Sequence, residues 1–150
     1  MMSKNYTYKD YRNENSDKKI NNFNYIHMAY NFNDIPDDLI FSMIEIISPT
    51  FKIVDNMLFI DDLFSQSKYD EHLSSGISKE KTQFWLNLVD ISSVFDTLEY
   101  EDTITIAEKI AHCWNLKIKA ENMQALGKAR ILRDDPETEV LITVDQYSND

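Results

Sequence analysis

QFWLNLVDISSVFDTLEYED, Gln83 to Asp102, decides how this 150-residue chain is interpreted. The stretch begins strongly apolar and ends acidic around Tyr100. On a helix capped by Ser78 and starting at about Lys79, apolar residues cover most of the circumference. They are Phe84, Trp85, Leu86, Leu88, Val89, Ile91, Val94, Phe95 and Leu98, and the polar strip is Gln83, Asn87, Asp90 and Ser93. Such a helix packs on several sides, so the stretch predicts a central helix with Trp85 in the core.

The chain after this stretch predicts a second long helix and a hairpin. A core face formed by Ile106, Ala107, Ile110, Trp114 and Ile118 indicates a helix over about 102–122, and MQALG ends that helix at Gly127. KARILRDDPETEVLITV then contains two β-rich runs. Asp135-Pro136-Glu137-Thr138 joins them as a type I turn, which predicts a C-terminal β-hairpin.

The first part of the chain, before Gln83, contains several different predicted elements. Residues 1–21 lack periodicity and predict a mobile tail, whereas FNYIHMAYNF (23–32) has the aromatic character of a strand. Asp34, Pro36 and the following acids then favour a helix that ends at Ser48-Pro49. Its apolar face consists of Leu39, Ile40, Met43, Ile44 and Ile47.

Two further elements complete the order. TFKIVDNMLFI (50–60) is either one strand or two strands that turn at Asp55-Asn56, and residues 62–74 form a short helix stopped by Gly76. The whole predicts an α+β fold with three to four helices and short antiparallel strands. We expect residues 22–150 to form a single globular domain.

Charge is the most informative bulk property. The chain carries 26 acidic and 15 basic residues, and five of the bases lie in the first twenty positions, so the rest has a net charge of −13. Such a field repels phosphate backbones and attracts basic partners. Direct nucleic-acid binding is therefore not expected, although acidity can also serve solubility alone.

The composition also limits where the protein is expected to be located and which catalytic motifs it can contain. There is no secretory apolar run or membrane-length segment, and the lone Cys113 forms no intramolecular bridge, so we expect a cytoplasmic protein with no membrane association. The only glycines are Gly76 and Gly127, which excludes a P-loop, a dinucleotide fingerprint and a GxSxG elbow.

Metal and catalytic motifs are weak. His112 and Cys113 are neighbours on a helix and point about 100° apart, so they form no chelating pair. Pro36-Asp37 has no matching Glu-x-Lys downstream, and Asp61-Asp62 suits a helix start better than acid-base work. No enzyme activity, metal or cofactor is expected.

Two acidic clusters remain as candidate partner-binding residues. One contains Asp96, Glu99, Tyr100, Glu101 and Asp102, and the other contains Asp134, Asp135 and Glu137, with Glu139 nearby. A tyrosine among carboxylates suits a protein interface, because the ring anchors and the charges steer a partner. The alternative is a solvated loop whose Glu101 and Asp102 favour the next helix N-terminus, and a solvated hairpin tip.

The small size, the acidity, the Asn- and Lys-rich tail and the QFWLNL helix resemble the immunity proteins of bacterial contact-dependent growth-inhibition and polymorphic-toxin systems. The resemblance implies a tight complex with a cognate toxin domain, often a basic nuclease, whose active or substrate-binding surface is covered. Two alternatives stay open: a phosphate-mimicking inhibitor of a nucleic-acid-binding protein, and a small metal-dependent hydrolase.

Overall fold

The computed structural model describes residues 6–133 and 138–146. It confirms the α+β class, with helices accompanied by short antiparallel strands. The chain divides into two compact units, Met1–Ser42 and Met43–Asp150. Asp134, Asp135 and Glu137, from the second acidic cluster, lie outside the described residues, as does most of the predicted turn around Pro136.

The first unit is helical. It contains α1 (Tyr8–Glu14), α2 (Asn22–Phe32) and the start of α3 (Asp37–Ile47). Residues 1–21 were predicted as a mobile tail without helical periodicity, but they contain α1, which begins where the Thr7 and Asp10 side chains form a capping box.

The strand predicted at 23–32 is also wrong. Asn21 and Asn24 form a capping box that starts α2, and Phe23, Ile26 and Tyr30 recur at helical spacing. Aromatic content favours strands only weakly, so the local cap and the spacing determine the element.

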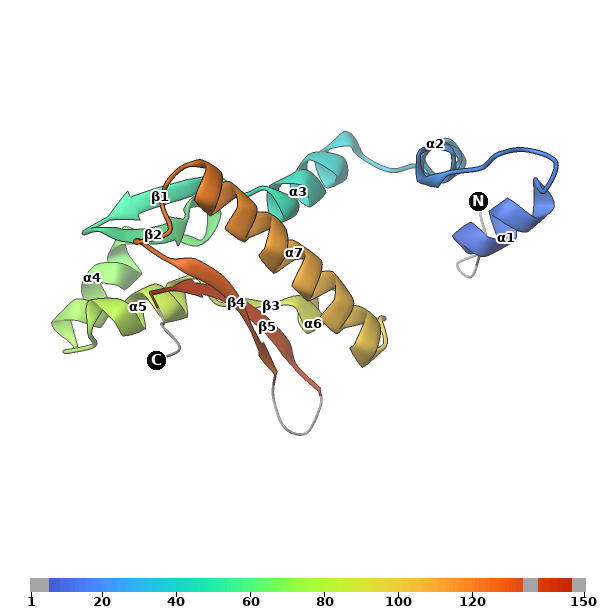
Figure 1. Cartoon of the computed structure of the whole chain (residues 1–150). Helices are drawn as coiled ribbons and strands as arrows, with labels where there is room; N and C mark the ends of the chain where they lie inside the picture. The colour runs from blue at the N-terminus through green and yellow to red at the C-terminus, as the bar shows by residue number, and fades with distance from the viewer. Residues whose placement is uncertain (1–5, 134–137, 147–150) are drawn as a thin grey trace. The chain divides into compact units, whose positions relative to one another are not determined.

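The second unit contains two small antiparallel sheets (Figure 1). β1 (Phe51–Val54) and β2 (Met57–Ile60) form a hairpin whose turn residues, Asp55 and Asn56, have φ values of 49° and 62°. Two left-handed residues in succession characterise the type I′ turn that suits two-residue hairpins. Of the two readings of residues 50–60, the structure shows two strands.

The other sheet has the strand order β3-β5-β4. β4 (Lys128–Arg133) and β5 (Val140–Asp145) pair from Lys128↔Asp145 to Arg133↔Val140, which confirms the C-terminal hairpin. β3 (Val89–Asp90) pairs with the other edge of β5. This third strand was not predicted, because it lies within the supposed central helix.

The stretch from Lys79 to Leu98 is therefore not one helix, and that prediction is wrong. α5 (Lys79–Leu86) ends, the chain extends through β3, and α6 (Ile91–Val94) restarts. Asp90 caps α6 by accepting hydrogen bonds from the Ser92 and Ser93 side chains and from the Ser93 backbone N–H at 3.1 Å. Burial opposes ionisation of Asp90, but these hydrogen bonds outweigh it and lower its pKa below the ordinary 3.8.

The supposed polar strip of α5 faces inward. Gln83 and Asn87 are fully buried, whereas Trp85, predicted as core, is 56% exposed. The Asn87 amide donates to Leu58 O and Val144 O, each at 2.9 Å, and its oxygen accepts from Ile60 N at 2.9 Å. Amide side chains thus bind backbone groups of β2 and β5, which joins the two sheets. Apolar periodicity carries no information on such partners.

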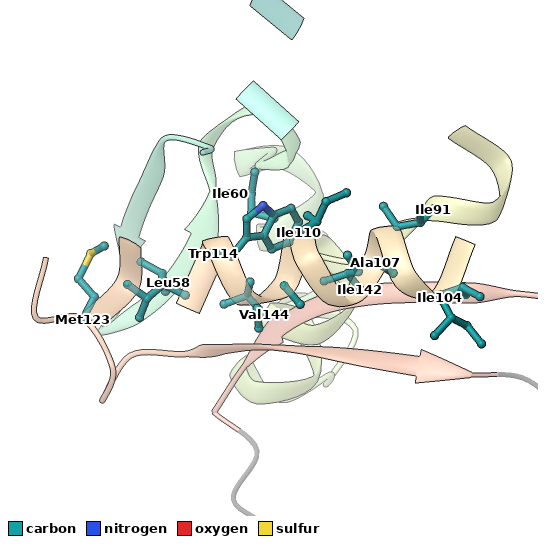
Figure 2. Close-up of a cluster of buried hydrophobic side chains, with 14 residues drawn as sticks. Leu58, Ile60, Ile91, Ile104, Ala107, Ile110, Trp114, Met123, Ile142 and Val144 are labelled. Carbon is teal, nitrogen blue, oxygen red and sulfur yellow. The ribbon is translucent and has the colours of Figure 1, made fainter. Parts of the chain in front are cut away.

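The central helix is instead α7 (Tyr100–Ala120), which confirms the second long helix. Figure 2 shows its side chains meeting those of β2 and β5 in the main core. The predicted end at Gly127 is wrong, because the helix ends at Ala120 and Asn122 takes the left-handed conformation with φ 57°. Gly127 is buried where an added Cβ would lie 2.9 Å from Gln83 Nε2 and from Val144 Cγ1.

A smaller core cluster lies between the first hairpin and two connecting elements, η1 (Asp61–Leu63) and α4 (Gln66–Ser74). The helix predicted at 62–74 is present as α4, which begins later, at Gln66. The cluster contains Met57, Phe59 and Tyr69. The Tyr69 hydroxyl donates to Asp55 Oδ2 at 2.7 Å. Burial and this hydrogen bond raise the pKa of Tyr69 to about 12, and the same bond, followed by nearby Lys79, lowers the pKa of Asp55.

Candidate functional site

The first acidic cluster lies where α6 leads into α7 (Figure 1). Asp96, Glu99, Glu101 and Asp102 are all exposed. Glu99 is the N-cap residue of α7, without a side-chain capping bond, and Glu101 and Asp102 lie in its first turn. Within the described ranges, none of these four carboxylates takes part in a salt bridge.

Two roles are therefore compatible with the same carboxylates. Acids in the first turn complement the positive end of the helix dipole, as the solvated-loop alternative proposed. Because they remain exposed, the same charges also face any approaching protein. The predicted partner-binding role of the cluster stays a prediction.

Tyr100 is less exposed than the four carboxylates around it. It is half-buried and packs against the main core. Its ring therefore fixes the first turn of α7 to the folded body, which holds the neighbouring carboxylates in place.

An apolar groove next to this cluster was not predicted. It has a volume of about 320 Å³. One wall is the last part of α3, with Met43, Ile46 and Ile47, and Phe95 also lines the groove. The other wall is α7, with Ile106, Lys109, Ile110 and Cys113.

Two hydrogen bonds hold the walls together. The Trp114 indole Nε1 donates to Ile46 O at 2.7 Å, and Lys117 Nζ donates to Pro49 O at 2.7 Å. Both bonds come from α7 and reach the end of α3 or the residues just after it. The groove is thus part of the folded structure rather than a gap between loosely placed segments.

The acidic cluster borders the groove. Asp102 lies on the same face of α7 as the lining residues, because Ile106, Lys109, Ile110 and Cys113 follow it by 4, 7, 8 and 11 positions. Asp96 follows the lining residue Phe95 directly. Asp102 therefore lies at the end of the groove nearest the N-terminus of α7.

Three further features concern metal ligands, the thiol and membrane spanning. Across residues 6–133 and 138–146, no group of three or more His, Cys, Asp or Glu side chains could hold a metal ion. Cys113 is a free, half-buried thiol. Among the helices in those ranges, none combines the length and apolar character needed to span a bilayer.

Comparisons with protein-family models, with curated proteins and with solved structures each found no match.

Proposed function

We propose that this chain is a protein-binding inhibitor of the immunity type, which binds a basic toxin domain and covers its active or substrate-binding surface. The observation that carries the proposal is the open apolar groove with carboxylates at one end. Interfaces commonly combine an apolar centre that excludes water with a polar rim, and this surface has both parts.

The negative net charge of the chain supports a positively charged partner. A formal charge of −11 attracts a basic protein from a distance and raises its association rate. A nuclease domain carries positive charge where it binds phosphates, so an acidic inhibitor competes for that surface with nucleic acid. Inhibition by covering needs no catalytic group on the inhibitor.

The test is capture of a partner from the producing cells, with the full chain as bait, at low and at high salt. The comparison is a bait in which Glu99, Glu101 and Asp102 are all changed to Lys. A control bait carries the same three reversals at exposed acids on other elements, namely Asp62, Glu71 and Glu80.

We expect a basic protein to be retained at low salt by the wild type and by the control bait, and to be lost from the cluster variant. A Glu99→Gln, Glu101→Gln, Asp102→Asn bait shows whether removal of charge suffices, and circular dichroism verifies that each bait is folded. Equal retention by the wild-type and cluster-variant baits would contradict the proposed placement of the interface.

A further inference from the structure

The groove between α3 and α7 is accessible and largely apolar. Among its lining residues, Met43 and Ile47 are 48% and 47% exposed. The exposed apolar surface continues onto Ile44 of the same helix. Extended exposed apolar surfaces commonly mark binding sites.

The charges around the groove are arranged along its length. Lys109 is the only charged lining residue, and in the part of the chain that the structure describes it forms no salt bridge. Asp102, one turn before Ile106 on α7, lies beyond the end of the groove near that residue, and Asp96 directly follows the lining residue Phe95 in the chain. Asp102 and Cys113 are eleven positions apart on α7, which corresponds to on the order of 16 Å along the helix axis.

A ligand that uses both the groove and its acidic end must therefore extend over about three helical turns. A small apolar molecule in the groove does not reach the carboxylates. An amphipathic helix does, because apolar residues at i, i+4 and i+7 fit a groove between two helices and a basic residue one turn further meets the acids.

We infer that this groove receives an amphipathic helix with an apolar seam and Lys or Arg at one end, supplied by the partner protein. The inference rests on the proposed function, since it specifies which part of that partner is bound. Apolar burial in the groove provides the affinity, and pairing with Asp96 and Asp102 fixes the direction of the helix.

Cys113 provides a reporter, because it is the only cysteine in the chain and lines the groove. The experiment measures the rate at which Cys113 of the full chain reacts with an uncharged maleimide. The probe is an Ala-based helical peptide of about 14 residues, with Leu at i, i+4 and i+7 and two Lys residues one turn beyond. One control peptide has the same composition in scrambled order, and another carries Glu in place of Lys.

We expect the basic peptide to slow labelling at least fivefold at saturation, with an apparent affinity that weakens as salt is added. The scrambled peptide should leave the rate unchanged, and the acidic peptide should need at least tenfold more peptide for equal protection. Ile47→Gln should weaken protection by the basic peptide. Ile53→Gln, at a similarly exposed isoleucine of β1 outside the groove, should not.

Several results would overturn the inference. Equal protection by the basic and scrambled peptides, or no protection, excludes a helix-specific groove. Protection by decanoate but not by peptide identifies a pocket for apolar anions. A labelling rate that falls as the protein concentration is raised, without any peptide, identifies a second copy as the occupant. A thiol that reacts only in urea shows that the groove is closed.

This experiment is separable from the test of the proposed function. If the peptide does not protect Cys113 while capture of the partner still depends on the acidic cluster, only the inference about the groove is rejected. Protection by the peptide while charge reversal leaves capture unchanged rejects the placement of the toxin interface.

Discussion

Replacement of Asn87 tests the buried amide junction on which the fold depends. Its side chain makes three hydrogen bonds, to Ile60 N, Leu58 O and Val144 O, and is fully buried. In Asn87→Ala, Leu58 O keeps the bond from Gln83 Nε2 at 3.0 Å, whereas Ile60 N and Val144 O lose their bonds to this side chain. A buried polar group left unpaired costs about 1–3 kcal/mol, so for these two groups we expect a loss of about 2–6 kcal/mol in unfolding free energy.

Urea denaturation followed by circular dichroism measures this loss. With a urea dependence of about 2 kcal/mol per molar, the midpoint should fall by about 1–3 M. Gln124→Ala, at an exposed amide, is the matched control and should stay within about 0.5 kcal/mol of wild type.

Asn87→Asp separates hydrogen bonding from packing, because it keeps the volume of the side chain. At neutral pH it replaces the donor to Leu58 O and Val144 O with an acceptor and introduces a buried charge. We expect it to destabilise the protein at least as much as Asn87→Ala does. A stability within about 0.5 kcal/mol of wild type would refute the assignment of this junction.

Three further changes test other parts of the account. Gly127→Ala should lower the free energy of unfolding by about 1–3 kcal/mol, measured by urea denaturation, because its Cβ would lie 2.9 Å from Val144 Cγ1; an unchanged midpoint would contradict the packing there. The pKa of Asp90 is lower in the folded state than its ordinary 3.8, so its contribution is present above about that pH and is lost as the pH falls through the folded pKa. Asp90→Asn should be less stable than wild type at neutral pH, and the gap between their urea midpoints should narrow in acid; a constant gap would refute the role of its charge. Tyr69→Phe should raise the pKa of Asp55 toward 3.8, measured by NMR titration of its carboxyl, and an unchanged pKa would exclude the Tyr69 hydrogen bond as its main cause.

The parts of the fold that follow from local chemistry were predictable from the sequence. The alternating residues of β5 favour a strand, so the C-terminal hairpin was predicted. Asp55-Asn56 tolerates left-handed φ values, so a hairpin at residues 50–60 was one of two alternatives, and the structure shows that one. The apolar spacing of α7 likewise identified its buried face, including Trp114. These signals lie within one element and need no knowledge of the partner elements.

The α5 to α6 region failed for the opposite reason. Gln83 binds Leu126 O, 43 positions away, and Asn87 binds Val144 O, 57 positions away. No local pattern shows that a polar side chain will be buried against a distant carbonyl. The prediction that Trp85 lies in the core failed for the same reason, because the buried face of the helix was assigned from apolarity alone, and Trp85 is exposed.

Only the acidic part of the candidate site was predictable from the sequence, and the groove was not. Charge density along the sequence located Asp96, Glu99, Glu101 and Asp102, whose exposure the structure shows. The groove depends on α3 packing beside α7, which the sequence does not specify. The available signal was on α7, where Ile106, predicted as part of the core face, is only half-buried and Cys113 follows it two turns later.

The most direct test of the central claim, that this surface binds a basic protein, is the association rate of the captured partner over a range of salt concentrations. The wild type should associate fast at low salt and slow steeply as salt rises. The variant with Glu99, Glu101 and Asp102 changed to Lys should associate on the order of tenfold more slowly at low salt and depend less on salt. Identical rates and salt slopes for the two folded proteins would contradict the account.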